Sequence, residues 1–179
     1  MNAHEVLHFW FVECEPKQWF QKNLSFDKEI EKRFLTIHTS ATKCETVRWR
    51  ETIEGRLAEI IVLDQFSRNI YRNDSRSFAY DGMALILTQE AIATKQVKEL
   101  SADQRAFLYM PLMHSESLVI HEEALQCFSE NGLEKYLDYE KKHQEIIARF
   151  GRYPHRNEIV KRASTSEEIA FLKEPNSSF

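Results

Sequence analysis

The amino-acid sequence predicts an all-α fold built from antiparallel helix pairs. Only 4 of the 179 residues are Gly and only 4 are Pro, so the tight turns that hairpin-rich sheets need are scarce. Apolar residues follow the 3.6-residue period of an amphipathic helix wherever a period is readable. A chain of this length buries one substantial core, and we therefore expect a single helical domain over residues 1–179.

Four helices are expected in the first half of the chain. Residues 4–12 are so rich in apolar side chains that a helix there must be covered on most sides. One apolar stripe predicts a helix over residues 27–37, and another predicts a longer helix at about residues 44–71. Ser77 is expected to cap a fourth helix, which continues to about residue 94.

Two helices with clear start signals follow. Ser101 begins the capping-box pattern S-x-x-Q, and Pro111 is expected to kink or end the helix that it starts. Ser115 is expected to cap the next helix, whose buried stripe includes Leu118. Gly132 ends that helix because glycine readily takes the left-handed conformation.

The longest clear period covers residues 133–150, with Tyr139 among its inward positions and Gly151 at its end. A short helix over residues 166–173 precedes a polar tail, 175–179, which we expect to be frayed. Short loops between antiparallel helices favour an α-solenoid or an irregular bundle. The similar sizes of successive pairs are compatible with degenerate tetratricopeptide-like units.

Charge and cysteine content limit the compartment and the partners. The net charge of -4 and the pI near 6.0 provide no broad basic field, so no general attraction to nucleic acid or anionic lipid is expected. The three cysteines are widely separated and form no C-x-x-C pair, which indicates a reducing compartment. The sequence shows no secretory leader and no apolar stretch of roughly 20 residues, so we expect a cytoplasmic protein without a membrane anchor.

Several polar side chains fall on apolar helix stripes: Asp64, His114, His121 and His143. A buried polar group costs free energy unless it has a partner. One interpretation is that each is a satisfied core group, such as Asp64 paired with Arg68 one helical turn later. The other is that together they line a cavity.

Three histidines raise the question of a metal site. Zinc sites on helices usually combine histidines with a carboxylate or thiolate at close spacing, as in H-E-x-x-H, and this chain lacks that pattern. The glycine-rich phosphate and dinucleotide motifs and the G-x-S-x-G elbow are also absent. We therefore expect no metal and no standard cofactor.

Residues 149–162 form a basic run that differs from the rest of the chain. Helix-ending and turn residues surround a cluster of donor side chains, Arg149, Arg152, His155, Arg156 and Asn157. Guanidinium groups bind carboxylate or phosphate in a bidentate manner. One arginine would suffice to complement the dipole at a helix C-terminus, and this cluster contains more than that role needs.

The chain resembles the bacterial family called domain of unknown function nine-two-four, whose known folds are all-helical and tetratricopeptide-like. The resemblance rests on DQFSRN at 64–69, FAYD at 78–81, YMPLMHSE at 109–116 and the segment 143–157. The sequence departs from the family pattern at Lys161, where the family has Gly. The resemblance implies no established activity or cofactor, and it places these residues at signature positions: Asp64, Arg68, Asn69, Asp81, His114, Glu116, His143, Arg152, Arg156 and Asn157.

The first functional hypothesis is a small-ligand-binding protein, which would be an enzyme if chemistry occurs there. Its cavity would accept a small anionic molecule or an acidic peptide end, held by Arg68, Arg152 and Arg156. Asp64 or Asp81 would orient these arginines. His114 or His143, if it titrates near neutrality, would move a proton.

The alternative hypothesis is a tetratricopeptide-like scaffold whose concave face binds a peptide segment. The polar residues would then be mostly structural. A closed pocket with converging donors favours the ligand-binding hypothesis, and an open groove with exposed apolar patches favours the scaffold. RNA contact through residues 149–162 is a weaker possibility, because the chain is acidic overall.

Overall fold

The computed structural model describes residues 2–175 and 177–178. Helices contain 72 % of these residues, and no β-strand occurs among them. The all-α prediction is therefore confirmed. Short 3₁₀ and π-helical turns connect and interrupt the α-helices, at η1 (Phe9–Glu13), η2 (Pro16–Trp19), η3 (Val47–Glu51), η4 (Val62–Phe66), η5 (Ser75–Phe78), η6 (Gln96–Glu99) and η7 (Pro154–Arg156).

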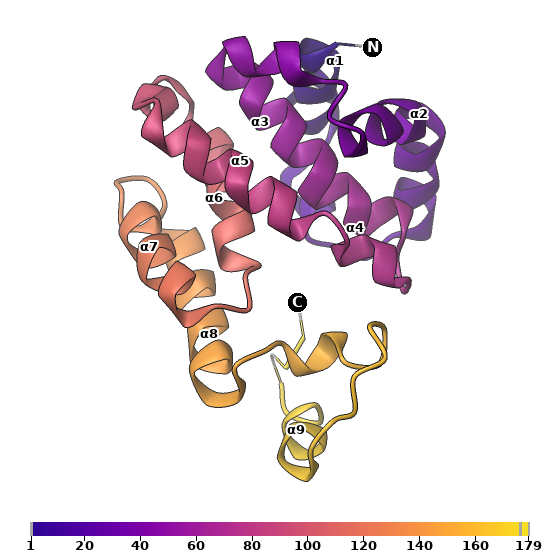
Figure 1. The fold of residues 1–179 in the computed structure, drawn as a ribbon, viewed down its shortest axis with the longest axis vertical. Coiled ribbons are helices and arrows are strands. Elements are labelled where there is room, and N and C mark those ends of the chain that lie inside the picture. Colours follow the sequence, from indigo (N-terminus) through magenta and orange to yellow (C-terminus); the bar gives the residue numbers. More distant parts are fainter. Residues whose placement is uncertain (1, 176, 179) are drawn as a thin grey trace.

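The first helices of the chain form one group at the N-terminal end of the molecule (Figure 1). α3 packs against α1, and α2 packs against α4. The group consists of α1 (Ala3–His8), α2 (Leu24–Thr42), α3 (Ile53–Ile61) and α4 (Ser67–Ile70).

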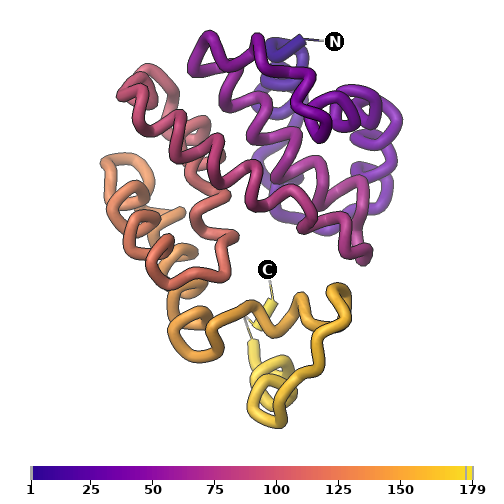
Figure 2. Tube along the Cα trace, viewed as in Figure 1, coloured from indigo at the N-terminus to yellow at the C-terminus, as the bar shows by residue number. Residues whose placement is uncertain are grey.

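The following helices pack in succession, α5 on α6, α6 on α7 and α7 on α8. After α8 the chain turns and runs back below α4 (Figure 2), so a segment from the C-terminal end faces helices from the first half of the sequence. The helices of this part are α5 (Asp81–Ala93), α6 (Ala102–Met113), α7 (Leu118–Phe128), α8 (Glu134–Phe150) and α9 (Ser166–Phe171).

Two hydrophobic clusters hold these parts together. The larger one extends from α1 to α8 and includes fully buried aromatic residues such as Trp10, Phe66 and Phe107. The smaller one joins the end of α8 to the C-terminal segment through Tyr153 and Phe171. Tyr153, which is fully buried, therefore fixes the start of that segment.

The helix that starts at Ile53 contains a π-helical turn, η4, between α3 and α4. Asp64 and Gln65 both lie in this turn, and both are buried. A π turn inserts one residue into the helical register and is often found at functional sites. Here it places an acidic side chain where the preceding apolar stripe would have continued.

The predicted helix signals are confirmed at several termini. Ser101 and Gln104 form the expected capping box, and α6 ends two residues after Pro111. Gly132 and Gly151 have φ values of 86° and 67°, in the left-handed region where glycine carries no Cβ penalty.

The start of the third predicted helix was wrong, since α3 begins at Ile53 and not near residue 44. Thr52 is extended, and its hydroxyl accepts a hydrogen bond from the Gly55 N–H. A Cβ at Gly55 would lie 1.8 Å from the Trp49 carbonyl oxygen, so this close turn requires glycine. The apolar period before residue 52 reflects the 3₁₀ turn η3 instead.

The two helix starts predicted at Ser77 and Ser115 were also wrong. The Ser77 hydroxyl donates to the Asp74 carbonyl, and α5 begins only at Asp81. α7 begins at Leu118 after Ser117, whose side chain makes no capping hydrogen bond. In both cases the residue at the N-cap, Tyr80 or Ser117, makes no side-chain capping hydrogen bond.

Two predicted core positions are exposed: Leu118 is 44 % exposed and Tyr139 is 40 % exposed. His121, which was expected on the buried stripe, is fully buried as predicted, and it lies 2.6 Å (Nδ1 to Oε1) from Glu140, which is also fully buried. The stripes were therefore wrong at Leu118 and Tyr139 and right at buried positions such as Phe128 and Ile147.

Part of the tail that was expected to be frayed, residues 176 and 179, lies outside the described residues. Ser177 is buried, and its hydroxyl donates to the Leu172 carbonyl at 3.2 Å.

Candidate functional site

A pocket of about 620 Å³ opens where the C-terminal segment faces the first half of the chain. Its walls come from residues 19–22, from η4 and α4, from η5, from the end of α6, from α8 and from residues 153–159. Pockets of this size accept drug-sized molecules. Segments far apart in the sequence thus contribute to one cavity.

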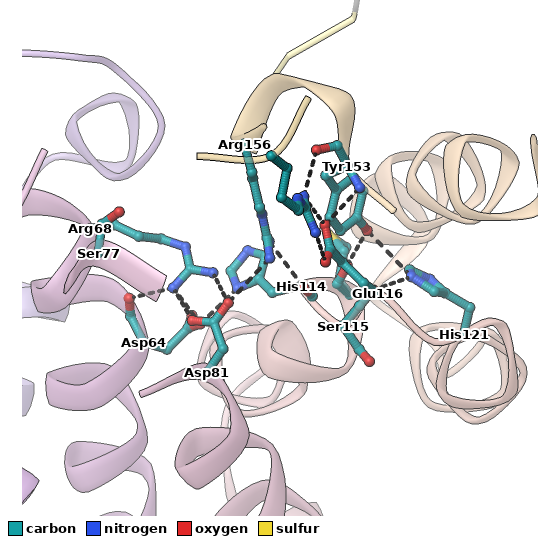
Figure 3. A network of polar contacts seen from close by, with 12 residues as sticks. Asp64, Arg68, Ser77, Asp81, His114, Ser115, Glu116, His121, Tyr153 and Arg156 are labelled. Atoms are coloured by element: carbon teal, nitrogen blue, oxygen red, sulfur yellow. Dashed lines mark hydrogen bonds and ion pairs between the residues drawn. The ribbon is translucent and has the colours of Figure 1, made fainter. Parts of the chain in front are cut away.

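Arg68 and two carboxylates form the innermost cluster of the site (Figure 3). The Arg68 guanidinium lies 3.0 Å from Asp64 Oδ1 and donates to both oxygens of Asp81, at 2.9 and 3.0 Å. Burial disfavours the Asp64 charge, but the positive charge of Arg68 and the hydrogen bond from His114 hold the pKa of this carboxyl well below its usual range. Burial likewise opposes the charge of Arg68, and the two carboxylates raise its pKa. Arg68 is therefore a half-buried cation whose charge two carboxylates compensate.

Arg156 reaches the same cluster from the C-terminal segment, but its charge is poorly compensated. Its nearest carboxylate oxygen belongs to Asp81 at 3.4 Å, and its Nη2 donates to the His114 carbonyl at 3.0 Å. The guanidinium lies over the rings of Phe78 and Tyr153, 4.6 Å from each centre. Its buried Nε has no hydrogen-bond partner within residues 2–175 and 177–178.

The pKa of Arg156 moves in the direction opposite to that of Arg68. The residue is only 8 % exposed, and burial, together with the neighbouring charge of Arg68, lowers its pKa. A lowered arginine pKa means that its surroundings disfavour the positive charge. An added anion at this position would relieve that penalty.

Three histidines line the pocket, and burial keeps them neutral at neutral pH. Burial lowers the pKa of His143 to about 3 and, with the charge of Arg156, lowers that of His155 to about 3. Burial and the charge of Arg68 also lower the pKa of His114. The pKa of His143 therefore lies well below neutrality, against the expectation for this residue, and the pKa of His114 is lowered from its ordinary value.

Hydrogen bonds fix the tautomers of two of these rings. The Nδ1 of His114 lies 2.7 Å from Asp64 Oδ1, and the ionised carboxylate can only accept, so the ring donates from Nδ1. The Nδ1 of His143 donates to the Tyr139 carbonyl at 2.7 Å. When neutral, each ring therefore has its other nitrogen, Nε2, as an acceptor.

All the charged side chains that line the pocket are positive. Lys22, Arg72 and Lys142 join Arg68 and Arg156 in the walls, and no Asp or Glu lines the pocket among the residues that the structure describes. The carboxylates that partner the three arginines lie behind the wall. Arg72, for example, is held by Asp27 through contacts of 2.5 and 2.7 Å.

The structure divides the ten predicted site residues into three groups. Those that line the pocket are Arg68, Asn69, His114, His143 and Arg156. Asp64 and Asp81 lie directly behind them and orient Arg68, as expected. Glu116, Arg152 and Asn157 are not among the lining residues.

This third group braces the C-terminal segment. Arg152 binds Glu168 through contacts of 2.6 and 2.8 Å, so it does not join the other two arginines as was expected. Glu116 binds Arg162 at 2.6 and 2.8 Å and accepts a hydrogen bond from the Tyr153 N–H at 2.8 Å. The Asn157 amide donates to Ser164 and Glu168.

Sequence reasoning missed several residues of the pocket wall. Arg72 lies one helical turn after Arg68, and this spacing was a usable signal for a second arginine on the same face. Lys22 and Lys142 gave no such signal, because single lysines on a polar helix face or in a loop are common. Glu140, the partner of buried His121, was also missed.

Within residues 2–175 and 177–178, no group of three or more His, Cys, Asp or Glu side chains is arranged to hold a metal ion. A helix long and apolar enough to cross a membrane is also absent from this part of the chain.

Comparison with known proteins places the chain in a family. Residues 6–176 match the family described as "Bacterial protein of unknown function (DUF924)". The chain belongs to this family. A solved structure of a protein of unknown function, ATU0120 from Agrobacterium tumefaciens, is 35 % identical, with 96 % of each chain covered and a TM-score of 0.91. No curated protein matches the chain. The family resemblance predicted from the signature residues is confirmed.

Proposed function

We propose that this DUF924 protein binds a small anionic molecule in the pocket, with Arg156 as the principal anion contact and Arg68 beside it. The observation that carries the proposal is the uniform sign of the lining charges: five cations and no carboxylate among the described residues. Like charges collected around a concave, partly desolvated site focus a positive potential on it. Such a site raises the local concentration of anions.

The pairing of the two arginines supports a division of roles. Arg68 is already saturated by Asp64 and Asp81, whereas Arg156 is buried with a weak carboxylate contact and an unpartnered Nε. A carboxylate or phosphate oxygen would accept hydrogen bonds from Arg156 and complete the hydrogen bonding of its guanidinium.

The peptide-binding scaffold remains the alternative. Successive packing of α5, α6, α7 and α8 is compatible with tetratricopeptide-like stacking, which we retain as part of this proposal. Donor side chains that converge on one pocket support the small-ligand proposal more directly. We also propose that the protein acts in the cytoplasm, since all three cysteines are free thiols.

The test measures stabilisation of the protein by anions. Phosphate, sulfate, acetate and citrate, compared with KCl at equal ionic strength, are expected to raise the unfolding midpoint in a saturable manner. A ligand at one hundred times its Kd adds about 2.7 kcal/mol to the free energy of unfolding.

Arg156→Gln is expected to abolish this gain. Arg149→Gln is the matched control, because Arg149 lies in the same basic run but is exposed and paired with Glu167. Anion stabilisation that is absent from the parent protein, or that survives in Arg156→Gln, would contradict the proposal.

A further inference from the structure

The pocket has a net positive charge, which indicates the negative charge expected of its ligand. Five cations line it. Three carboxylates partner them from behind the wall, Asp27, Asp64 and Asp81. The lining histidines are neutral, so two positive charges remain. A phosphate monoester, with a charge of about -1.5 to -2 at pH 7, matches this surplus better than a single carboxylate does.

An exposed aromatic pair forms another part of the pocket wall. Phe20 is 51 % exposed and Tyr139 is 40 % exposed, and their rings stack with centres 6.5 Å apart and an angle of 21° between their planes. Lys142 lies 5.5 Å over the Tyr139 ring. Both aromatic residues line the pocket. A planar ring of a ligand could cover this exposed apolar surface by stacking on it.

The aromatic pair is separated from the arginine cluster. From Arg156 the contacts lead to the Tyr153 ring at 4.6 Å and from there to the His143 ring at 5.7 Å. His143 then lies one helical turn from Tyr139. A ligand that touches both ends therefore needs a spacer of several bonds between its ring and its anionic group.

Carboxamide side chains occur elsewhere in the wall. Gln21, Gln65, Asn69 and Asn73 line the pocket. Gln65 and Asn69 donate to the carboxylates Asp64 and Asp27, which leaves their amide oxygens as acceptors. Amides provide both donors and acceptors, which suits sugar hydroxyls and the edges of nucleobases.

We propose that the ligand class of this pocket is a nucleoside monophosphate, with the phosphate at Arg156 and the base on the Phe20–Tyr139 pair. This inference rests on the proposed anion-binding function and adds the ring and the spacer to it. A phosphate alone satisfies only the arginine end. The ribose provides the spacer that the wall geometry requires.

The test is a calorimetric titration of the full-length chain with probes that contain one part of the ligand or all of it. The probes are inorganic phosphate, ribose 5-phosphate, adenosine, phenyl phosphate and the monophosphates AMP, GMP, CMP and UMP. At least one nucleotide is expected to bind about tenfold or more tightly than phosphate and ribose 5-phosphate, since stacking of one base is worth roughly that factor.

Substitution of the aromatic pair locates the base. Phe20→Ala is expected to remove the tenfold advantage of the nucleotide while inorganic phosphate binds as before. Leu24→Ala is the control, because Leu24 is exposed and does not line the pocket. Tyr139→Ser provides a second variant, so the test does not depend on the folding of one protein.

The outcomes separate this inference from the proposed function. If no phosphate-containing probe binds, both are overturned. If phosphate and the nucleotides bind equally, the anion site stands and the nucleotide class is refuted. Phenyl phosphate binding as tightly as every nucleotide would refute the spacer, and a nucleotide affinity unchanged in both aromatic variants would refute the stacking site.

Discussion

Arg68 and Arg156 contact the same carboxylate, Asp81, and yet their replacement by Gln is expected to change the free energy of unfolding very differently. Arg68→Gln leaves Asp64 buried without its cation and removes both contacts from Asp81. Loss of one partner from a buried ion pair typically costs about 3–5 kcal/mol. For a chain of this size the melting temperature would fall by about 6–20 °C.

Arg156→Gln changes the free energy of unfolding through terms that oppose one another. The variant loses a charged hydrogen bond to the His114 carbonyl, worth about 1.5–3 kcal/mol, and the aromatic contacts, worth about 0.5–2 kcal/mol. It gains relief from burying a guanidinium beside Arg68, the effect that lowers the pKa of Arg156. Asp81 keeps its two contacts with Arg68. This relief offsets part of the lost contacts, so we expect a smaller net loss than in Arg68→Gln.

Denaturant unfolding of the parent and both variants at pH 7.5 measures the difference, with m-values compared so that only stability changes are counted. Arg149→Gln again serves as the control for removing an exposed arginine. Equal losses of 3 kcal/mol or more in both variants would refute the reasoning, because Arg156 would then be a structural ion-pair partner and not a group held ready for an anion. An unchanged free energy of unfolding in Arg68→Gln would also refute the reasoning.

Three further predictions concern the rest of the structure. His143 and His155 have pKa values of about 3 in the folded protein and about 6.5 when unfolded, so the unfolded state binds more protons below pH 6.5. The free energy of unfolding, measured from pH 7.5 to 5.5, should therefore be lower at pH 5.5 by about 1.4 kcal/mol per histidine. His143→Gln should show a smaller decrease over the same range. Lys161 has a φ of 57°, so Lys161→Gly should stabilise the protein by about 0.5–1 kcal/mol in denaturant unfolding, whereas Lys161→Ala, which keeps the Cβ, should not. Glu140→Ala removes the partner of buried His121 and should cost about 3–5 kcal/mol; a loss below 1 kcal/mol would show that this pair does not hold α7 on α8.

Local signals in the sequence correctly predicted the structural features that depend only on residues close together in the chain. The Ser101 capping box, the left-handed Gly132 and Gly151 and the ion pair of Asp64 with Arg68 each involve residues no more than four positions apart. Such features depend on backbone geometry that a short segment determines by itself.

The arrangement of the site depends on ion pairs between residues far apart in the sequence, which no local pattern predicts. Asp81 meets Arg156 across 75 residues, and Asp27 meets Arg72 across 45. A sequence shows that arginines and carboxylates are present, but the packing of α8 and the C-terminal segment decides which of them meet. For the same reason Arg152 could not be distinguished from Arg156 before the structure placed Glu168 beside it.

Some signature residues line the pocket and others brace the C-terminal segment, and this division follows from the cost of burying Arg156. A guanidinium in this position is disfavoured by desolvation and by Arg68, so the segment that carries it must be held in place by other contacts. The ion pairs of Arg152 with Glu168 and of Glu116 with Arg162 anchor that segment on both sides of Arg156, and buried Tyr153 packs beneath the guanidinium. These two ion pairs do not line the pocket, and they are thus needed to keep one poorly compensated cation inside it. This arrangement is expected where a charge is retained for binding, because a purely structural arginine would have been given a carboxylate of its own.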